Sequence, residues 1–352
     1  MSLQYPDCIW CLCVVLDFTR VGSTVSDQLR TTADNFPKVV VVGSYGVGLS
    51  LTMERMPEAG ETVTGRHFAS GHGGKGSNQA VAVARLGATA VLCSAVGSDP
   101  FGEHAKALWA DEGVDCTMVR TLPGSTMVGV ILVDAAGENR IALAPGVLAD
   151  YTAECLDGLD AALTDADVLL VGLEIPVDTA HEALRIGRRA GVITILNPAP
   201  APPDALPAGM LALADHVTPN RTEAARLAGL PLDSDPAALI GAVCFADVGT
   251  TVLTLGSDGA LIRQGDDIAK IEAVVAPSVV DTTGAGDAFN GAYAVRLADR
   301  ATPIAAARFA ARAASWCVTK REVIPSLAFR RDLELPGGAT DSRLTTTEPC
   351  PA

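Results

Sequence analysis

The sequence predicts one large α/β domain with a mostly parallel central sheet, helices on both faces and a small β-sheet lid. Three observations support this prediction. Short runs rich in Val, Ile and Leu recur along the chain, as buried parallel strands do. Alanine-rich stretches of helical length lie between these runs. Two β-rich segments interrupt the alternation, and they form the predicted lid.

The strands and helices of the main sheet alternate along the chain. The first strand is expected where four consecutive valines follow Lys38 and end at Gly43. Because strand and helix alternate, the sheet is expected to be parallel. Further strands are predicted at residues 90–96, 168–171, 192–196, 216–218 and 251–254, and helices at 77–86, 102–112, 179–190 and 223–228.

The lid is predicted from residues 61–68 and 125–143, and the second segment forms a hairpin around the turn at 136–139. Allowing for connections, the lid covers about 48–70 and 117–145 of a domain at 37–335. An appendage near the carboxyl ends of parallel strands can close over a site. The alternatives are a purely structural flap or a contact between subunits.

The two ends of the chain are predicted to lie outside the domain. Residues 1–36 are expected to be disordered or to pack on the domain surface, and residues 336–352 to be loose. The apolar run at 8–18 is too short to span a bilayer. Nine scattered cysteines indicate reduced thiols in a cytoplasmic protein, and Cys8, Cys11 and Cys13 lack a second ligand pair for a metal.

Composition limits the partners. The chain has 352 residues, 49% of them hydrophobic and 19% charged, with a net charge of −15. A nucleic-acid partner would require a basic face, and the sequence shows none. An anionic substrate such as ATP would need local relief from this negative charge, which lysines, helix starts and a metal cation can provide.

The segment 281–291, DTTGAGDAFNG, carries the clearest chemical signal. It combines a glycine-rich turn, a helix start and the carboxylate of Asp287. Backbone N–H groups at such a turn can hold a phosphoryl group, and a carboxylate there can take a proton from an attacking hydroxyl. The pattern indicates phosphoryl transfer to an alcohol. The competing interpretation is a tight turn with a capping Asp.

Three other loops add to this signal. In 73–80, GGKGSNQA, glycines, a lysine and an asparagine at a helix start can bind the hydroxyls of a small polar ligand. Asn220 and Glu223 are three residues apart on a first helical turn and suit hydrated magnesium beside phosphates, although ordinary capping explains them too. The loop 254–259, TLGSDG, follows a strand and is a candidate nucleotide contact.

Taken together, these segments resemble the ribokinase family of carbohydrate kinases over about residues 39–326. The resemblance rests on six separated motifs in family order. They are GGKGSNQA at 73–80, VGSD at 96–99 with Phe101–Gly102, LEIP at 173–176, NPAP at 197–200, Asn220 with Glu223, and DTTGAGD at 281–287.

The resemblance implies an ATP-dependent sugar kinase with a ribokinase-like fold that phosphorylates a hydroxymethyl group. It implies ATP and Mg²⁺ as cofactors, a potassium-type cation, and a homodimer formed through the lid. Asp287 would be the general base. The other implied roles are N–H donors to phosphate at Gly284, Ala285 and Gly286; sugar contacts at Gly74, Lys75, Asn78 and Glu174; magnesium and phosphate contacts at Asn220 and Glu223; nucleotide contacts at Thr254 and Gly256; and the monovalent cation at Asp281, Thr283 and Ser326.

The sequence departs from the family pattern at two places. The first strand of ribokinases is followed by Asn and Asp that bind sugar hydroxyls, and Gly46 and Gly48 replace them here. This predicts a more open pocket floor and leaves the acceptor sugar undefined. Glu322 stands where the family more often has glycine, so it either folds outward or alters cation dependence.

Two other functions remain open from the sequence. The open pocket floor also suits a nucleoside kinase of the same fold. A catalytically weak sugar-binding regulatory protein would keep the fold without turnover, but the presence of Asp287, Lys75, Asn220 and Glu223 speaks against it.

Overall fold

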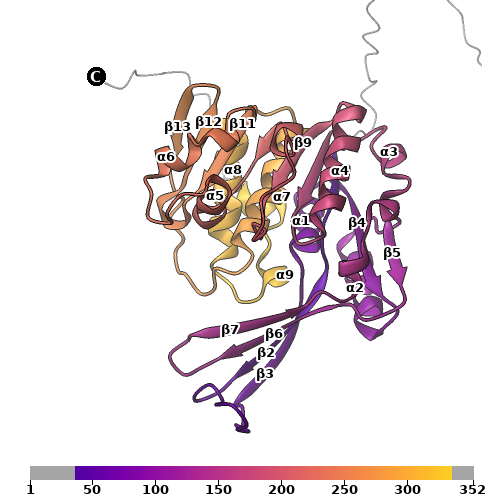
Figure 1. Ribbon diagram of the computed structural model, residues 1–352, viewed down its shortest axis with the longest axis vertical. Coiled ribbons are helices and arrows are strands. Elements are labelled where there is room, and N and C mark those ends of the chain that lie inside the picture. Colours follow the sequence, from indigo (N-terminus) through magenta and orange to yellow (C-terminus); the bar gives the residue numbers. More distant parts are fainter. Residues whose placement is uncertain (1–35, 335–352) are drawn as a thin grey trace, which may run out of the picture. The chain divides into compact units, whose positions relative to one another are not determined.

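The computed structural model describes residues 36–334, and the predicted extension and tail lie outside these residues. Figure 1 shows a large sheet flanked by helices, with a second, smaller sheet extending beyond the ends of its strands. This is the predicted α/β arrangement with a lid.

The main sheet has nine strands, and its centre is completely buried. Val39 to Val42 of the first strand have no exposed surface, because helices cover both faces of the sheet. Seven strands are parallel, and the last two in the chain add antiparallel at one edge. In spatial order they are β13 (Asp267–Ile271), β12 (Ala260–Gln264), β11 (Thr250–Thr254), β10 (His216–Val217), β9 (Ile193–Asn197), β8 (Val168–Gly172), β1 (Lys38–Val42), β4 (Thr89–Gly97) and β5 (Val119–Leu122).

The helices form one layer on each face of this sheet. One core cluster joins the sheet to α1 (Lys75–Arg85), α2 (Pro100–Glu112), α7 (Ala285–Ala298) and α8 (Pro303–Cys317). The other joins it to α3 (Leu159–Ala162), α4 (Val177–Ala190), α5 (Arg221–Ala228) and α6 (Pro236–Ile240). The short helices α9 (Val323–Ser326) and α10 (Arg330–Leu333) follow α8.

The structure confirms every predicted strand and helix of the main domain. Most of their boundaries differ from the predicted ones by one or two residues. The edge strands β12 and β13 were not predicted from the sequence. Three of their four exposed positions, Gln264, Asp267 and Lys270, carry polar residues, as an edge that is partly in water allows, so these strands lack the apolar run of a central strand.

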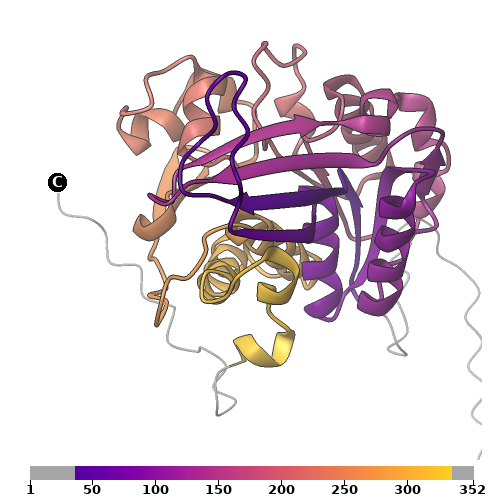
Figure 2. The ribbon, with the colours of Figure 1, turned by 90° about the horizontal axis from the view of Figure 1, so that it is seen from below.

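The lid is a four-stranded sheet, drawn in indigo and magenta across the front of Figure 2. Its strands are β3 (His67–Gly73), β2 (Gly46–Thr52), β6 (Met127–Val133) and β7 (Asn139–Ala144), in that spatial order. The hairpin around 136–139 is confirmed.

Two predicted lid boundaries are wrong. Residues 117–122 belong to the main sheet, because β5 pairs with β4 through Ser94 and Val119. Residues 61–66 form a loop rather than a strand, because Gly60 adopts a left-handed φ and Arg55 pairs with Glu61 within the loop. The strand on this side begins at His67, and its partner β2 begins at Gly46.

One carboxylate fixes the root of the lid to the main domain. Asp99 caps α2 by accepting the Gly102 N–H, and it also accepts the backbone N–H and the hydroxyl of Thr126, which precedes β6. Burial opposes ionisation of Asp99, but these hydrogen bonds outweigh it and lower its pKa. The lid therefore leaves the main sheet from a fixed point.

Within residues 36–334, no helix is both long and apolar enough to cross a membrane. The cysteines in this range with a described state are free thiols: Cys93, Cys116, Cys155, Cys244 and Cys317. The cluster Cys8, Cys11 and Cys13 lies outside the described residues.

Candidate active site

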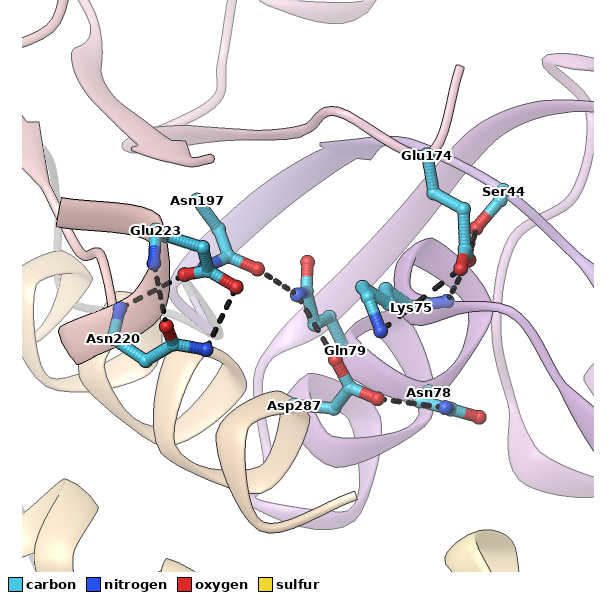
Figure 3. Close-up of polar contacts among 9 residues, drawn as sticks. All are labelled: Ser44, Lys75, Asn78, Gln79, Glu174, Asn197, Asn220, Glu223 and Asp287. Atoms are coloured by element: carbon cyan, nitrogen blue, oxygen red, sulfur yellow. Dashed lines mark hydrogen bonds and ion pairs between the residues drawn. The ribbon is translucent and has the colours of Figure 1, made fainter. Parts of the chain in front are cut away.

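The candidate site is a cavity of about 210 Å³ at the carboxyl end of the parallel strands. Residues from the four predicted loops line it, and Figure 3 shows polar side chains from three of these loops converging. The lining residues are Lys75, Asn197, Ala199, Thr218, Asn220, Glu223, Thr254, Gly284, Gly286, Asp287 and Asn290. The structure thus brings together motifs that are more than 200 residues apart in the chain.

Asp287 lies on the first turn of α7 and points into this cavity. Its carboxylate accepts a hydrogen bond from Asn78 Nδ2 at 2.7 Å and one from Gln79 Nε2 at 3.3 Å. Only 8% of the residue is exposed. Two donors on α1 therefore fix the orientation of the acid and leave its remaining lone pairs for a ligand (Figure 3).

The surroundings of Asp287 raise the pKa of its carboxyl, which favours proton acceptance. Burial, with a smaller contribution from Glu174, raises the pKa of its carboxyl to about 6, against the opposing effects of Lys75 and the Asn78 and Gln79 hydrogen bonds. A base with a pKa close to the working pH combines a useful ionised fraction with good proton affinity.

The turn before α7 has the glycine-rich backbone that the sequence predicts to bind an anion. Gly284 adopts a left-handed φ of 84°, and a Cβ at this position would lie 2.5 Å from Val323 Cγ1. Gly286 has no atom within 4 Å of its Cβ position, which leaves open space above the helix start. Glycine is therefore required for conformation at the first position and for space at the second.

One predicted donor is already used. The N–H of Ala285 donates to the carbonyl of Thr282 at 3.3 Å, so a phosphate at this donor would compete with a hydrogen bond within the turn. The N–H groups of Gly286 and Asp287 have no acceptor within residues 36–334. The open donors are therefore those of Gly286 and Asp287, on the first turn of the helix, where N–H groups have no intrahelical partner.

Lys75 and Glu174 form the polar wall beside the acid. Glu174 Oε2 accepts the Lys75 backbone N–H at 2.9 Å and the Ser44 hydroxyl at 2.5 Å, and the Lys75 ammonium lies 3.9 Å from Glu174 Oε1. Burial lowers the pKa of Lys75, but Asp287, Glu174 and Glu223 outweigh it, so its pKa is raised and it stays charged. Gly74 precedes it at φ 87°, where any Cβ would collide with Tyr45.

Asn78 has an unused acceptor. Its amide nitrogen binds Asp287, while its Oδ1 is buried and makes no hydrogen bond within residues 36–334. The residue is 4% exposed. Leaving a buried carbonyl oxygen unpaired costs roughly 1–3 kcal/mol, which a ligand hydroxyl can recover.

Asn220 and Glu223 are held together by a capping box at the start of α5. Asn220 Oδ1 accepts the Glu223 N–H at 2.9 Å, and Glu223 accepts the Asn220 N–H and Nδ2, both at 2.8 Å. Burial raises the pKa of Glu223 to about 7, which the Asn220 hydrogen bonds and Lys75 oppose. The capping interpretation is therefore correct, and the same carboxylate also lines the cavity.

These oxygens fit a magnesium ion bound mainly to phosphates and water. Among residues 36–334 no cluster of three His, Cys, Asp or Glu side chains could hold a metal by itself. Mg²⁺ in kinases keeps several waters and needs only one or two protein carboxylates. Glu223 supplies one, and its unfavourable burial would be relieved by a cation.

The two predicted nucleotide contacts differ in position. Thr254 lines the cavity, and its N–H donates to the Pro219 carbonyl at 2.9 Å, next to Asn220. Gly256 follows in a turn with φ 60°, and nothing lies within 4 Å of its Cβ position. Its neighbours Leu255 and Ser257 line a second cavity of about 520 Å³.

The residues predicted for a monovalent cation lie together behind the anion-binding turn. Asp281 Oδ1 accepts the Thr283 N–H at 2.9 Å. The Cys317 thiol lies 3.7 Å from the Thr283 carbonyl and 3.0 Å from the Ser326 hydroxyl. Cys317 was not predicted from the sequence, and it joins the two halves of this group.

Comparison with known proteins fits this geometry. The sequence model of the pfkB family of carbohydrate kinases matches residues 37–329. The chain belongs to this family. A ribokinase of Haemophilus influenzae is 35% identical over 299 residues, covering 84% of this chain and 96% of the relative. A ribokinase of Bacillus subtilis is 35% identical over 301 residues, covering 84% and 98%.

Comparison with solved structures supports the same family. The structure of an Arabidopsis thaliana ribokinase complexed with ribose and ATP matches with a TM-score of 0.80 and 31% identity, covering 85% of this chain and 98% of that one. The predictions of the ribokinase-like fold and of an ATP-dependent sugar kinase are confirmed.

The lid of this sugar kinase corrects one prediction from the sequence. A Cβ at Gly46 would lie 2.5 Å from Met127 Cε, so the methionine fills the space of the missing polar side chain. At Gly48 the nearest atom to a Cβ is Ile131 Cδ1 at 3.5 Å, an ordinary contact. The pocket floor is open at Gly48 only.

Glu322 keeps the backbone shape of the glycine it replaces in this family. Its φ is 62° and its ψ is 150°, a region that is almost confined to glycine and costs of the order of 1–3 kcal/mol. The loop between α8 and α9 therefore keeps the backbone conformation that a glycine would adopt, and the charged Glu322 side chain extends out of the loop.

Three further side chains of this kinase were not predicted as site residues. Gln79 bridges Asp287 and Asn197, whose Oδ1 lies 3.1 Å from Gln79 Nε2. Asn290 accepts the Thr218 hydroxyl at 2.6 Å and donates to the Gly286 carbonyl at 2.8 Å. Each lies within or beside a motif already noted, and proximity to these motifs was the only available signal.

Proposed function

We propose that this kinase transfers the terminal phosphoryl group of ATP to a hydroxymethyl group of a pentose, with Asp287 as general base. The main observation in support of this proposal is the position of Asp287. It is a buried acid, oriented by Asn78 and Gln79, at the mouth of α7 in the cavity that also contains Lys75 and Asn220. D-Ribose is the first candidate, because relatives with 35% identity are ribokinases.

The chemistry follows from these positions. Asp287 takes the proton as the sugar oxygen bonds to the terminal phosphorus, and the bond from that phosphorus to the leaving oxygen of ADP breaks. Phosphoryl transfer needs positioning and charge neutralisation, which the Gly286 and Asp287 amides and the Lys75 ammonium supply. Mg²⁺, held near Glu223 and Asn220, neutralises phosphate charge when bound.

The acceptor side of the cavity provides hydroxyl partners. Asn78 Oδ1 is buried without a hydrogen-bond partner among residues 36–334, and Glu174 Oε1 lies 3.9 Å from the Lys75 ammonium. Gly74 allows the backbone to approach the ligand closely, since it carries no side chain. These groups support a polyhydroxylated acceptor.

The function is tested by ADP release with D-ribose, 2-deoxy-D-ribose, D-fructose and adenosine as acceptors. We expect the highest kcat/KM with a free pentose. Preference for adenosine would favour the nucleoside kinase, and thermal stabilisation by a sugar without any turnover would favour the regulatory protein.

We further propose that a potassium-type cation occupies the group formed by Asp281, Thr283 and Ser326. The glycine-type backbone of Glu322 supports this, because it leaves the loop carbonyls where a glycine would place them. Replacing sodium with potassium should increase kcat several-fold at constant ionic strength. Equal rates in both salts would contradict a cation role for this group.

We propose a homodimer through the outer face of the lid, in a cytoplasmic protein. Phe68 and Val130 support the dimer, because they lie on one face of the lid and are 61% and 41% exposed. Light scattering should give the mass of a dimer, and Phe68→Asp should shift it toward the monomer. A monomeric wild type would contradict the dimer. The free thiols support the location.

A further inference from the structure

The two departures from the ribokinase pattern meet in space. Gly48 pairs directly with Gly71 across the antiparallel strands β2 and β3, so the two positions share one face of the lid. Glu322 Oε2 lies 3.7 Å from the Cβ position of Gly71. A carboxylate is therefore missing at Gly48, and another reaches the adjacent strand on the same face.

Glu322 lies between the lid and the anion-binding turn. The next residue, Val323, contacts Gly284 at the start of α7, while the Glu322 side chain reaches β3. The loop between α8 and α9 therefore lies against both the turn before α7 and the lid. A ligand with one hydroxyl at Asp287 and its ring beneath the lid would pass close to this loop.

The carboxylate of Glu322 is free to bind such a ligand. Glu322 is exposed, and its carboxylate makes no hydrogen bond or ion pair with any group in residues 36–334. At Gly48, the space that an acid would fill is open, since only Ile131 Cδ1 approaches, at 3.5 Å. At Gly46, by contrast, Met127 leaves no room for a polar group.

We propose that Glu322 replaces the acid missing at Gly48 and accepts hydrogen bonds from sugar hydroxyls distant from the one that is phosphorylated. This inference rests on the proposed sugar kinase function and names a specificity-determining residue for it. An ionised carboxylate accepts and never donates, so it favours acceptors with free hydroxyl groups at that end. In this chain the sugar-binding carboxylate would come from Glu322 in the α8–α9 loop and not from the lid position of Gly48.

The test combines removal and relocation of the charge. Glu322→Gln keeps the length and backbone and removes the charge, and it should raise KM for D-ribose by about 10- to 100-fold, the effect of one charge-assisted hydrogen bond. KM for ATP should be unchanged. Glu138→Gln, in the exposed turn between β6 and β7, is the matched control and should leave both constants unchanged.

The relocation experiment uses Glu322→Gly with and without Gly48→Asp. Gly48 has no left-handed φ, so Asp fits its backbone. The single Glu322→Gly variant should lose D-ribose affinity, and adding Gly48→Asp should recover at least about tenfold of the loss, the step that corresponds to roughly 1.4 kcal/mol. Melting temperatures measured alongside show that each variant is folded, and Glu322→Gly should melt no lower than wild type, because glycine relieves the strained φ.

Three results would overturn the inference. They are an unchanged D-ribose KM in Glu322→Gln, a loss confined to kcat or to KM for ATP, and a double variant no better than Glu322→Gly. If the wild type phosphorylates a sugar while any of these holds, this inference alone is wrong. If the wild type phosphorylates no sugar in the acceptor screen, the proposed function is wrong, and this inference with it.

Discussion

Asp287→Asn should lower kcat by about 10²–10⁴-fold, the usual contribution of a positioned general base. The amide has nearly the same shape and can keep a hydrogen bond with Asn78, but it cannot take a proton from the sugar hydroxyl. ATP binding should persist, because the remaining phosphate donors are backbone groups and Lys75. Steady-state kinetics and ATP titration by calorimetry measure the two effects.

The matched control is Asp178→Asn. Asp178 is an exposed carboxylate in the first turn of α4, and its replacement should leave kcat unchanged. A near-normal rate in Asp287→Asn would show that another group accepts the proton.

Stability separates a catalytic effect from damage to the fold. The pKa of Asp287 is raised from 3.8 to about 6 by burial, so its folded state binds more protons than the unfolded state between these pH values. The resulting stability is present below pH about 4 and is lost as the pH rises through 6. Asn does not titrate, so Asp287→Asn should melt at or above the wild-type temperature at pH 8.

Gly286→Ala should lower kcat by about 10²–10³-fold, as expected for disturbing preorganised donors around developing charge. The added methyl group meets no protein atom within 4 Å, and the helical backbone tolerates alanine. It therefore occupies only the space that the transferring phosphoryl group needs. Kinetics should show the loss while circular dichroism and the melting temperature remain at wild-type values.

Gly284→Ala is the contrasting variant two residues away. Here the methyl group would be forced into a left-handed backbone and would lie 2.5 Å from Val323 Cγ1. It should lower the melting temperature as well as the rate. If Gly286→Ala retained full activity, the phosphoryl group could not lie above the start of α7.

The loops of the candidate site were predictable because their signals lie in short stretches of sequence. The glycines at 284 and 286 and the Asn220–Glu223 capping box have conformational signatures readable in any sequence. The strand β2 was not predicted, because Gly46 and Gly48 have low strand propensity and suggest a turn after β1. Only pairing with β3 and β6 makes this segment a strand.

Contacts between distant segments were the other part that sequence reasoning missed. That Gln79 reaches Asn197, that Met127 fills the space beside Gly46, and that Glu322 reaches β3 all depend on how the lid and loops pack. Periodicity and spacing contain no information on such pairs. The hydrogen bond from the Ala285 amide to Thr282 was not predicted for a similar reason, since it depends on the exact turn.

The most direct test of Asp287 as the base is the pH dependence of kcat/KM for the best acceptor sugar, measured from pH 5 to 8.5. At saturating Mg²⁺, which would keep Glu223 ionised despite its raised pKa of about 7, the Asp287 pKa of about 6 should make kcat/KM level above pH 7. Below pH 6, kcat/KM should fall toward tenfold per pH unit as the Asp287 carboxylate becomes protonated. The residual activity of Asp287→Asn should lack this inflection. A wild-type profile that stays flat down to pH 5, or an inflection that persists in Asp287→Asn, would contradict the account.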